Sequence, residues 1–304
     1  MPHTITAGLD GSPESLAAAD WAAREALLRD TPLHLVHALR REPDTHPPAG
    51  GTPQPPQDPG VQDQRADRLL RETAATLARN HPGLQIITDH VPGEPAPALL
   101  EAAEEADLLV LGSRGLGGVA RFLVGSVVLA VMTGSRRPVV VVRDGLRAED
   151  EHQPGTPGTG AESFRDVVLG LGSAAPDDAV IGFAFDAAAR RGARLRVVRG
   201  WSPDQPQDGD GDLSAELHAE LTGDTQRALS EVLDPWRNKF PGVEVVEQAV
   251  IGKAGSHLVE ASHDASLVVV GRRRRRTPAG TAIGPVTHAV LHHGGAPVAV
   301  VPHD

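Results

Sequence analysis

Short, continuously apolar runs alternate with longer segments of helical periodicity through the first half of the chain. In the runs LLVLG and VVVV the apolar residues follow one another without alternation, which is typical of a parallel strand covered by helices on both faces. The pattern predicts strands at 3–9, 33–39, 85–91, 107–112 and 138–143, and helices at 13–29, 62–80, 95–105 and 121–132. Joined by right-handed crossovers, these elements predict a doubly wound parallel sheet.

The second half of the chain repeats the first. ADLLVLGSRG resembles ASLVVVGRRR, and their glycines Gly112 and Gly271 lie 159 residues apart. The same spacing relates VPGEPAPALLEAA to VIGKAGSHLVEAS, and RPVVVVR to APVAVVP. Three separated matches at one domain-length spacing indicate a duplicated domain. Strands of the second copy are expected near 166–171, 194–199, 243–250, 266–271 and 297–301.

The duplication predicts an α/β chain with two tandem doubly wound five-stranded parallel sheets, each with helices on both faces. We place the first domain at 1–144, a linker at 145–162 and the second domain at 163–304. Because the stretch from Asp144 to Gly160 is rich in Gly, Pro, Asp and Glu, it is expected to be a flexible linker.

Composition excludes several classes of function. The formal net charge of −11 argues against sequence-independent nucleic-acid binding, which needs a basic surface. The absence of cysteine excludes disulfides, thiolate metal sites and a cysteine nucleophile. The sequence has neither a leader pattern at MPHTITAGLDGS nor an apolar run of about 18 residues, the usual length of a membrane span. We expect a cytoplasmic protein with no nucleic-acid and no membrane partner.

A glycine-rich segment follows the fourth expected strand. It reads Gly112-Ser113-Arg114-Gly115 and continues, after nine residues, with Gly125-Ser126-Val127 at the start of an apolar helix. Glycines let a phosphate approach the backbone closely, and the free N–H groups at a helix start favour an anion. Ser126 is expected to cap that helix or to donate its hydroxyl to a phosphate, and Arg114 either supplies a charge-assisted bond or is merely solvated.

The spacing Gly-x2-Gly-x9-Gly-Ser after a strand resembles the ATP-binding signature of universal stress proteins, and the resemblance covers nearly the whole chain as two copies. It implies a fold similar to the adenine nucleotide alpha hydrolases, and a site for ATP with Mg²⁺. Asp10 would lie near the adenosine and the backbone of Ala38 would meet the adenine; without the resemblance, Asp10 would be a helix cap and Ala38 a packing residue. The residues that would bind the phosphates are Gly112, Arg114, Gly115, Gly125, Ser126 and Val127.

The second copy departs from this signature. Arg274 stands where the first copy has Gly115, Pro285 stands in place of Ser126, and GLDGS is matched by Gly170-Leu171-Gly172-Ser173, which lacks the aspartate. Proline removes an N–H and the hydroxyl, so we expect weak or absent ATP binding there.

Two further clusters in the second copy are open to more than one interpretation. The run from Arg272 to Arg276 is interpreted as a solvated surface loop, the alternative being a loop that binds another phosphorylated ligand or an acidic partner. The residues His288, His292 and His293 have a spacing that a metal site would use, but no cysteine or acidic cluster accompanies them.

No catalytic serine, histidine and acid arrangement can be assembled, and His37 is expected only to pack or hydrogen-bond near the site. The favoured hypothesis is an ATP-binding sensor or regulator in the stress response, not an enzyme. The alternatives are a slow ATPase or adenylate-transferring enzyme and a nucleotide-independent interaction protein. Because terminal strands mediate dimerisation in the family, the resemblance also implies intramolecular pairing of the two domains, with a homodimer possible and the protein partner unknown.

Overall fold

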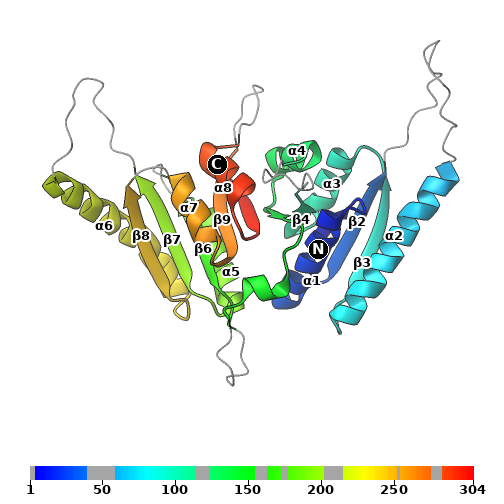
Figure 1. The fold of residues 1–304 in the computed structure, drawn as a ribbon, viewed down its shortest axis with the longest axis horizontal. Coiled ribbons are helices and arrows are strands. Elements are labelled where there is room, and N and C mark those ends of the chain that lie inside the picture. Colours follow the sequence, from blue (N-terminus) through cyan, green and yellow to red (C-terminus); the bar gives the residue numbers. More distant parts are fainter. Residues whose placement is uncertain are drawn as a thin grey trace, which may run out of the picture. The chain divides into compact units, whose positions relative to one another are not determined.

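The computed structural model describes residues 4–39, 59–113, 124–154, 163–172, 177–201, 215–251, 254–274 and 283–304. The described residues up to Gly145 form one compact unit, and those from Leu146 onwards form another. Among these residues each unit has a five-stranded parallel sheet with helices on both faces (Figure 1). The prediction of two tandem doubly wound α/β domains is therefore confirmed.

The strands of the first unit are arranged in the order β3-β2-β1-β4-β5, all parallel. They are β1 (Ile5–Leu9), β2 (Leu33–Leu39), β3 (Ile86–Pro92), β4 (Leu108–Gly112) and β5 (Val139–Val142). Because the chain builds outward from β1 in both directions, the gap between the carboxyl ends of β1 and β4 is a topological switch point. All of β5 and the first four residues of β4 are buried, which explains why these two runs are continuously apolar.

Helices cover both faces of this sheet. The helices α1 (Pro13–Arg29) and α2 (Pro59–Asn80) pack on one face, and α3 (Pro95–Glu104) and α4 (Ser126–Gly134) pack on the other. Helix α1 begins sharply because Ser12 caps its first turn and proline occupies the first helical position. Its buried side is rich in alanine, which lets the helix lie close to the sheet.

The second unit repeats this arrangement with the strand order β10-β9-β6-β7-β8. Its strands are β6 (Asp166–Leu171), β7 (Leu195–Trp201), β8 (Val245–Ile251), β9 (Ala265–Arg273) and β10 (Val298–His303). Its helices are α5 (Asp178–Arg191), α6 (Ala215–Lys239), α7 (Ala254–Ser262) and α8 (Pro285–His293). The register is also repeated, since Leu171 pairs with Arg199 as Leu9 pairs with His37. Among the described residues of the whole chain, no helix is both long and apolar enough to cross a membrane.

Part of the predicted linker has defined structure. Residues Ala148–Glu151 form a 3₁₀ turn (η1), and Glu151 is buried. The backbone N–H of Gln153 donates to Ser163, and that of Arg165 donates to Glu151. Flexibility was predicted from composition alone, but these bonds are made by the backbone, so composition does not reveal them. This segment belongs to the second unit, while 155–162 lie outside the described residues.

Candidate functional site

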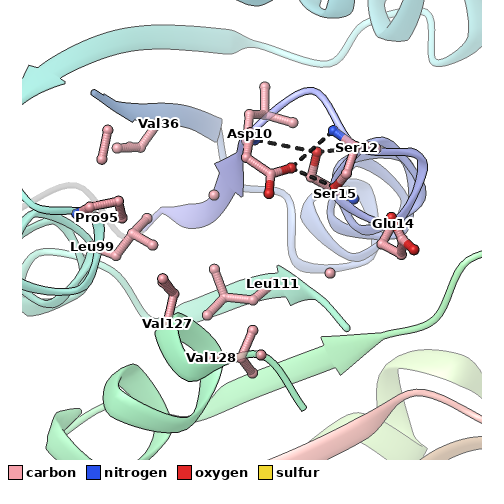
Figure 2. Close-up of a pocket in the computed structure, with 15 residues that line it drawn as sticks. Asp10, Ser12, Glu14, Ser15, Val36, Pro95, Leu99, Leu111, Val127 and Val128 are labelled. Atoms are coloured by element: carbon pink, nitrogen blue, oxygen red, sulfur yellow. Dashed lines mark hydrogen bonds between the residues drawn. The ribbon is translucent and has the colours of Figure 1, made fainter. Parts of the chain in front are cut away.

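A pocket opens at the carboxyl ends of β1, β2 and β4, beside the first turns of α1, α3 and α4 (Figure 2). Its volume of about 160 Å³ is roughly ten times what a single water requires, so it has room for a ligand. The lining residues are Gly8, Leu9, Asp10, Ser12, Glu14, Ser15, Val36, Ala38, Pro95, Leu99, Leu111, Gly112, Gly125, Val127 and Val128. The pocket therefore lies where open α/β sheets bind ligands, and it includes five of the eight residues predicted for the site.

The polar side of the pocket is a hydrogen-bonded turn between β1 and α1. Asp10 Oδ1 accepts from the backbone N–H of Ser12 at 2.9 Å and from the Ser12 hydroxyl at 2.5 Å. The Ser12 Oγ in turn accepts from the N–H of Ser15 at 3.2 Å, and the Ser15 hydroxyl donates to the carbonyl of Ser12 at 2.9 Å. Asp10 is therefore not the cap of α1: it holds the serine that is the cap.

The opposite side of the pocket is apolar. Figure 2 shows Pro95 and Leu99 from α3 facing the ends of the strands, with Val36 above them and Leu111 below. Ala38, at the carboxyl end of β2, completes this side. An apolar slot next to backbone N–H and C=O groups at a strand end has the chemistry to hold a flat, partly polar ring such as a nucleobase.

Gly112 has a structural reason to be glycine. A Cβ atom on it would lie 2.4 Å from the carbonyl carbon of Glu14 and 2.6 Å from the backbone nitrogen of Ser15. The end of β4 therefore packs directly on the backbone of the first turn of α1. This close contact brings β4 and the capped turn of α1 to the same side of the pocket.

The start of α4 forms the third side. Gly125 is its N-cap residue without a side-chain capping bond, and Gly125 and Val127 line the pocket. Ser126 is the first helical residue; it is exposed and not among the lining residues. The alternative that Ser126 caps this helix is wrong, because Gly125 is the cap residue and Ser126 is the first residue of the helix. The predicted helix start at 121 is also wrong, since α4 begins at Ser126. Arg114 and Gly115 lie outside the described residues.

Three polar residues that line the pocket were not predicted from the sequence. Ser12 is the N-cap residue of α1, and Glu14 and Ser15 lie in its first turn. The segment Asp10-Gly-Ser-Pro-Glu-Ser15 is a capping pattern that signals a helix start, and it could have shown that this turn borders the same strand ends. Asp10 and Glu14 are the ionisable residues among the fifteen lining residues, so the described walls carry negative and no positive side chains.

The corresponding place in the second unit is built differently. Gly200 occupies the position of Ala38 at the end of β7, and a Cβ there would lie 2.1 Å from the Cβ of Ala254. Helix α7 therefore approaches this strand so closely that only glycine fits, where the first unit accommodates alanine. Pro285 is the first residue of α8, as the sequence indicated, so that helix start lacks one N–H and the serine hydroxyl.

The interpretation of the arginine run as a solvated loop is wrong for Arg272. Strand β9 extends through Arg273, and Arg272 is 6% exposed. Its burial, and secondarily the charge of Arg274, lowers the pKa of the Arg272 guanidinium. Arg274 is partly exposed and pairs with Asp304 at 2.6 Å, while 275 and 276 lie outside the described residues.

The histidines of α8 give no metal site among the described residues. His288 and His292 stack with ring centroids 4.1 Å apart, one helical turn from each other. Across the described part of the chain, no group of three histidine or acidic residues is arranged to hold a metal ion.

The comparisons with known proteins agree with the repeat and with the fold. The sequence model of the universal stress protein family matches residues 1–143 and 163–302. The chain belongs to the universal stress protein family. A universal stress protein of Mycobacterium tuberculosis is 33% identical over 306 residues, covering 98% of this chain and 96% of the relative. The two matched segments make the chain a tandem member of the family.

A solved universal stress protein that covers almost the whole chain has the same architecture. It comes from Archaeoglobus fulgidus, has a TM-score of 0.71 at 16% identity and covers 99% of this chain and 98% of its own. A shorter universal stress protein, solved in complex with cAMP, is 29% identical, covers 47% of this chain and 99% of its own, and has a TM-score of 0.36.

Proposed function

We propose that the first unit of this universal stress protein binds ATP with Mg²⁺, and that the protein acts in the cytoplasm as a sensor or regulator of the stress response. The observation that carries the proposal is the pocket at the β1/β4 switch point, which joins an apolar slot to a polar turn. Asp10, Ala38, Gly112, Gly125 and Val127 all line it, although they come from four separate parts of the chain.

Each part of the nucleotide has a counterpart in this pocket. The adenine would lie between Leu99 and the end of β2, with its polar edge on the backbone of Ala38. The carboxylate of Asp10 would accept from the ribose hydroxyls, since Ser12 holds it in place. The phosphates would extend toward the start of α4, where the N–H groups of Ser126 and Val127 face an anion.

Further phosphate contacts are proposed from Gly112, Arg114 and Gly115. Mg²⁺ fits this site because Asp10 and Glu14 supply carboxylate oxygens, the ligands with which proteins bind Mg²⁺ together with substrate phosphates. We therefore expect ATP to bind as its Mg²⁺ complex.

A regulatory role rests on binding without rapid turnover. A site that holds ATP through backbone N–H groups and a helix start stabilises the bound nucleotide without favouring the transition state of hydrolysis over it. Occupancy would then bias the pairing of the two domains, or the contact with a partner, through the terminal strands. An assay of ATP hydrolysis under saturating Mg·ATP tests this part: we expect no sustained turnover, and turnover abolished by Asp10→Ala would support a slow ATPase instead.

Isothermal titration with Mg·ATP tests the site itself, using Ser126→Pro to copy Pro285 of the second unit. Proline is well tolerated at a first helical position, so folding should be kept while one N–H and one hydroxyl are lost. We expect affinity to fall about ten- to hundredfold, the value of one or two charge-assisted hydrogen bonds.

The matched control is Asp177→Ala, which removes a helix cap at α5 in the second unit and should leave ATP affinity unchanged. Wild-type protein that binds no adenine nucleotide would contradict the proposal. Equal affinity for Mg·ATP in the wild type and in Ser126→Pro would show that the phosphates do not bind at the start of α4.

A further inference from the structure

His37 links the ends of two strands that border the pocket. Its ring Nδ1 lies 2.7 Å from the carbonyl oxygen of Leu9, and the two residues are register partners on β2 and β1. Because a carbonyl oxygen only accepts hydrogen bonds, Nδ1 carries the proton and donates it. The imidazole therefore ties one strand end to the other through a side chain, in addition to the backbone ladder between them.

This hydrogen bond lies directly behind the proposed adenosine site. Leu9 precedes Asp10 and His37 precedes Ala38, and both Asp10 and Ala38 line the pocket. A bond between the two preceding residues fixes how far the carboxylate of Asp10 lies from the backbone of Ala38. That separation is the one a ligand must match if its ribose meets the carboxylate and its base meets the backbone.

The second unit has the same strands in the same register but a different residue at this position. Leu171 pairs with Arg199 there, so a long guanidinium side chain replaces the compact imidazole. In the same unit Gly200 closes against Ala254. The imidazole is thus present in the copy whose strand end borders a pocket, and absent from the copy whose strand end packs against Ala254.

We propose, on the basis of the proposed function, that His37 is a positioning residue for adenosine: by donating from Nδ1 to Leu9 it sets the distance between Asp10 and Ala38. This positioning depends on the hydrogen bond that Nδ1 donates and not on the bulk of the ring. It should act equally on every ligand that spans the two residues, whatever the number of its phosphates.

Three substitutions at His37 separate the hydrogen bond from the bulk of the ring. In His37→Asn the amide nitrogen stands at the δ position and can still donate to Leu9; in His37→Gln it is displaced by one carbon, and in His37→Phe no donor remains. Affinities for ATP and AMP, each with Mg²⁺, are measured by isothermal titration on the full chain.

We expect Gln and Phe to lose about tenfold in affinity for both ligands, and Asn to stay within about threefold of the wild type. His81→Asn is the matched control, because His81 contacts Asp20 at 2.8 Å but lies in the turn between α2 and β3, at the amino ends of the strands. It should bind both ligands as the wild type does.

The outcomes distinguish this inference from the function on which it rests. Wild-type protein that binds neither ligand overturns both. Binding by the wild type with all three variants unchanged overturns the role of His37 alone. Equal losses in all three variants, with a lowered midpoint of thermal unfolding, would make His37 a packing residue and overturn the assignment to Nδ1. Loss in Gln and Phe with rescue by Asn, at unchanged unfolding midpoints, supports it.

Discussion

The two units share a fold, a strand order and a register, yet only the first carries the complete set of residues of the predicted nucleotide site. In the first unit the end of β2 carries alanine beside an open pocket, and in the second the end of β7 carries a glycine against which α7 closes. The core strands are buried in both units. The comparison teaches that the sheet is kept by its apolar strands, while the two copies differ at a few positions at the strand ends, where the candidate site lies.

The largest effect is expected at the glycine that ends β4. Gly112→Ala places a Cβ 2.4 Å from the backbone of Glu14, so α1 must move away from β4. We expect the free energy of unfolding, measured by urea titration, to fall by about 3 kcal/mol, and Mg·ATP binding to be lost with it.

Gly271→Ala is the matched change in the second unit. The added Cβ would meet the ring of His303 at 3.0 Å and a methyl group of Val180 at 3.2 Å, both side chains that can shift. The loss should stay below about 1 kcal/mol, with ATP binding retained. Similar losses in the two variants would show that the close contact of β4 with α1 is not peculiar to the first unit.

A smaller effect is expected at the caps that begin the first helix of each unit. Ser12→Ala removes the cap of α1 and the hydroxyl that donates to Asp10, and Asp177→Ala removes the carboxylate that accepts from the N–H of Ala179. Each should lower the free energy of unfolding by about 1 kcal/mol. Only Ser12→Ala should also weaken ATP binding. If both variants bind ATP as the wild type does, the capped turn is not part of the site.

The smallest effect is expected at the ion pair of Arg274 with Asp304. Because Asp304 is largely exposed and Arg274 is partly exposed, Asp304→Asn should change the free energy of unfolding by no more than about 0.5 kcal/mol, with ATP affinity unchanged. A rise in phosphate affinity of the second unit, measured by titration of Asp304→Asn with inorganic phosphate, would instead support the alternative of an anion-binding loop.

The sequence was sufficient for the fold because its signals are local and repeated. The apolar run at 108–112 and the helix over 13–29 are set by residues within each segment. The second copy shows the corresponding pattern a second time, which supports each prediction independently. The start of α4 was misplaced because the apolar periodicity continues past its true boundary. The structured residues of the linker, 148–154, were missed because backbone bonds hold them to Ser163 and Arg165.

The candidate site was only partly predictable. The glycine spacing identified Gly112, but not that its lack of a Cβ serves the contact with α1. Nor does any local pattern reveal that His37 donates to Leu9, since 28 residues separate them and only the register of β1 with β2 brings them together. Contacts of this kind follow from the packing of elements and not from the residues within one element.

The central claim is that the chain has a single adenine-nucleotide site, in the first unit, and the stoichiometry of Mg·ATP binding tests it most directly. Titration of the wild-type chain should give about one ATP per chain, and titration of Asp10→Ala should show that site lost or greatly weakened. A stoichiometry of about two would place a second ATP in the second unit, and a single site that survives Asp10→Ala unchanged would show that Asp10 does not hold the nucleotide. Either result would contradict the account.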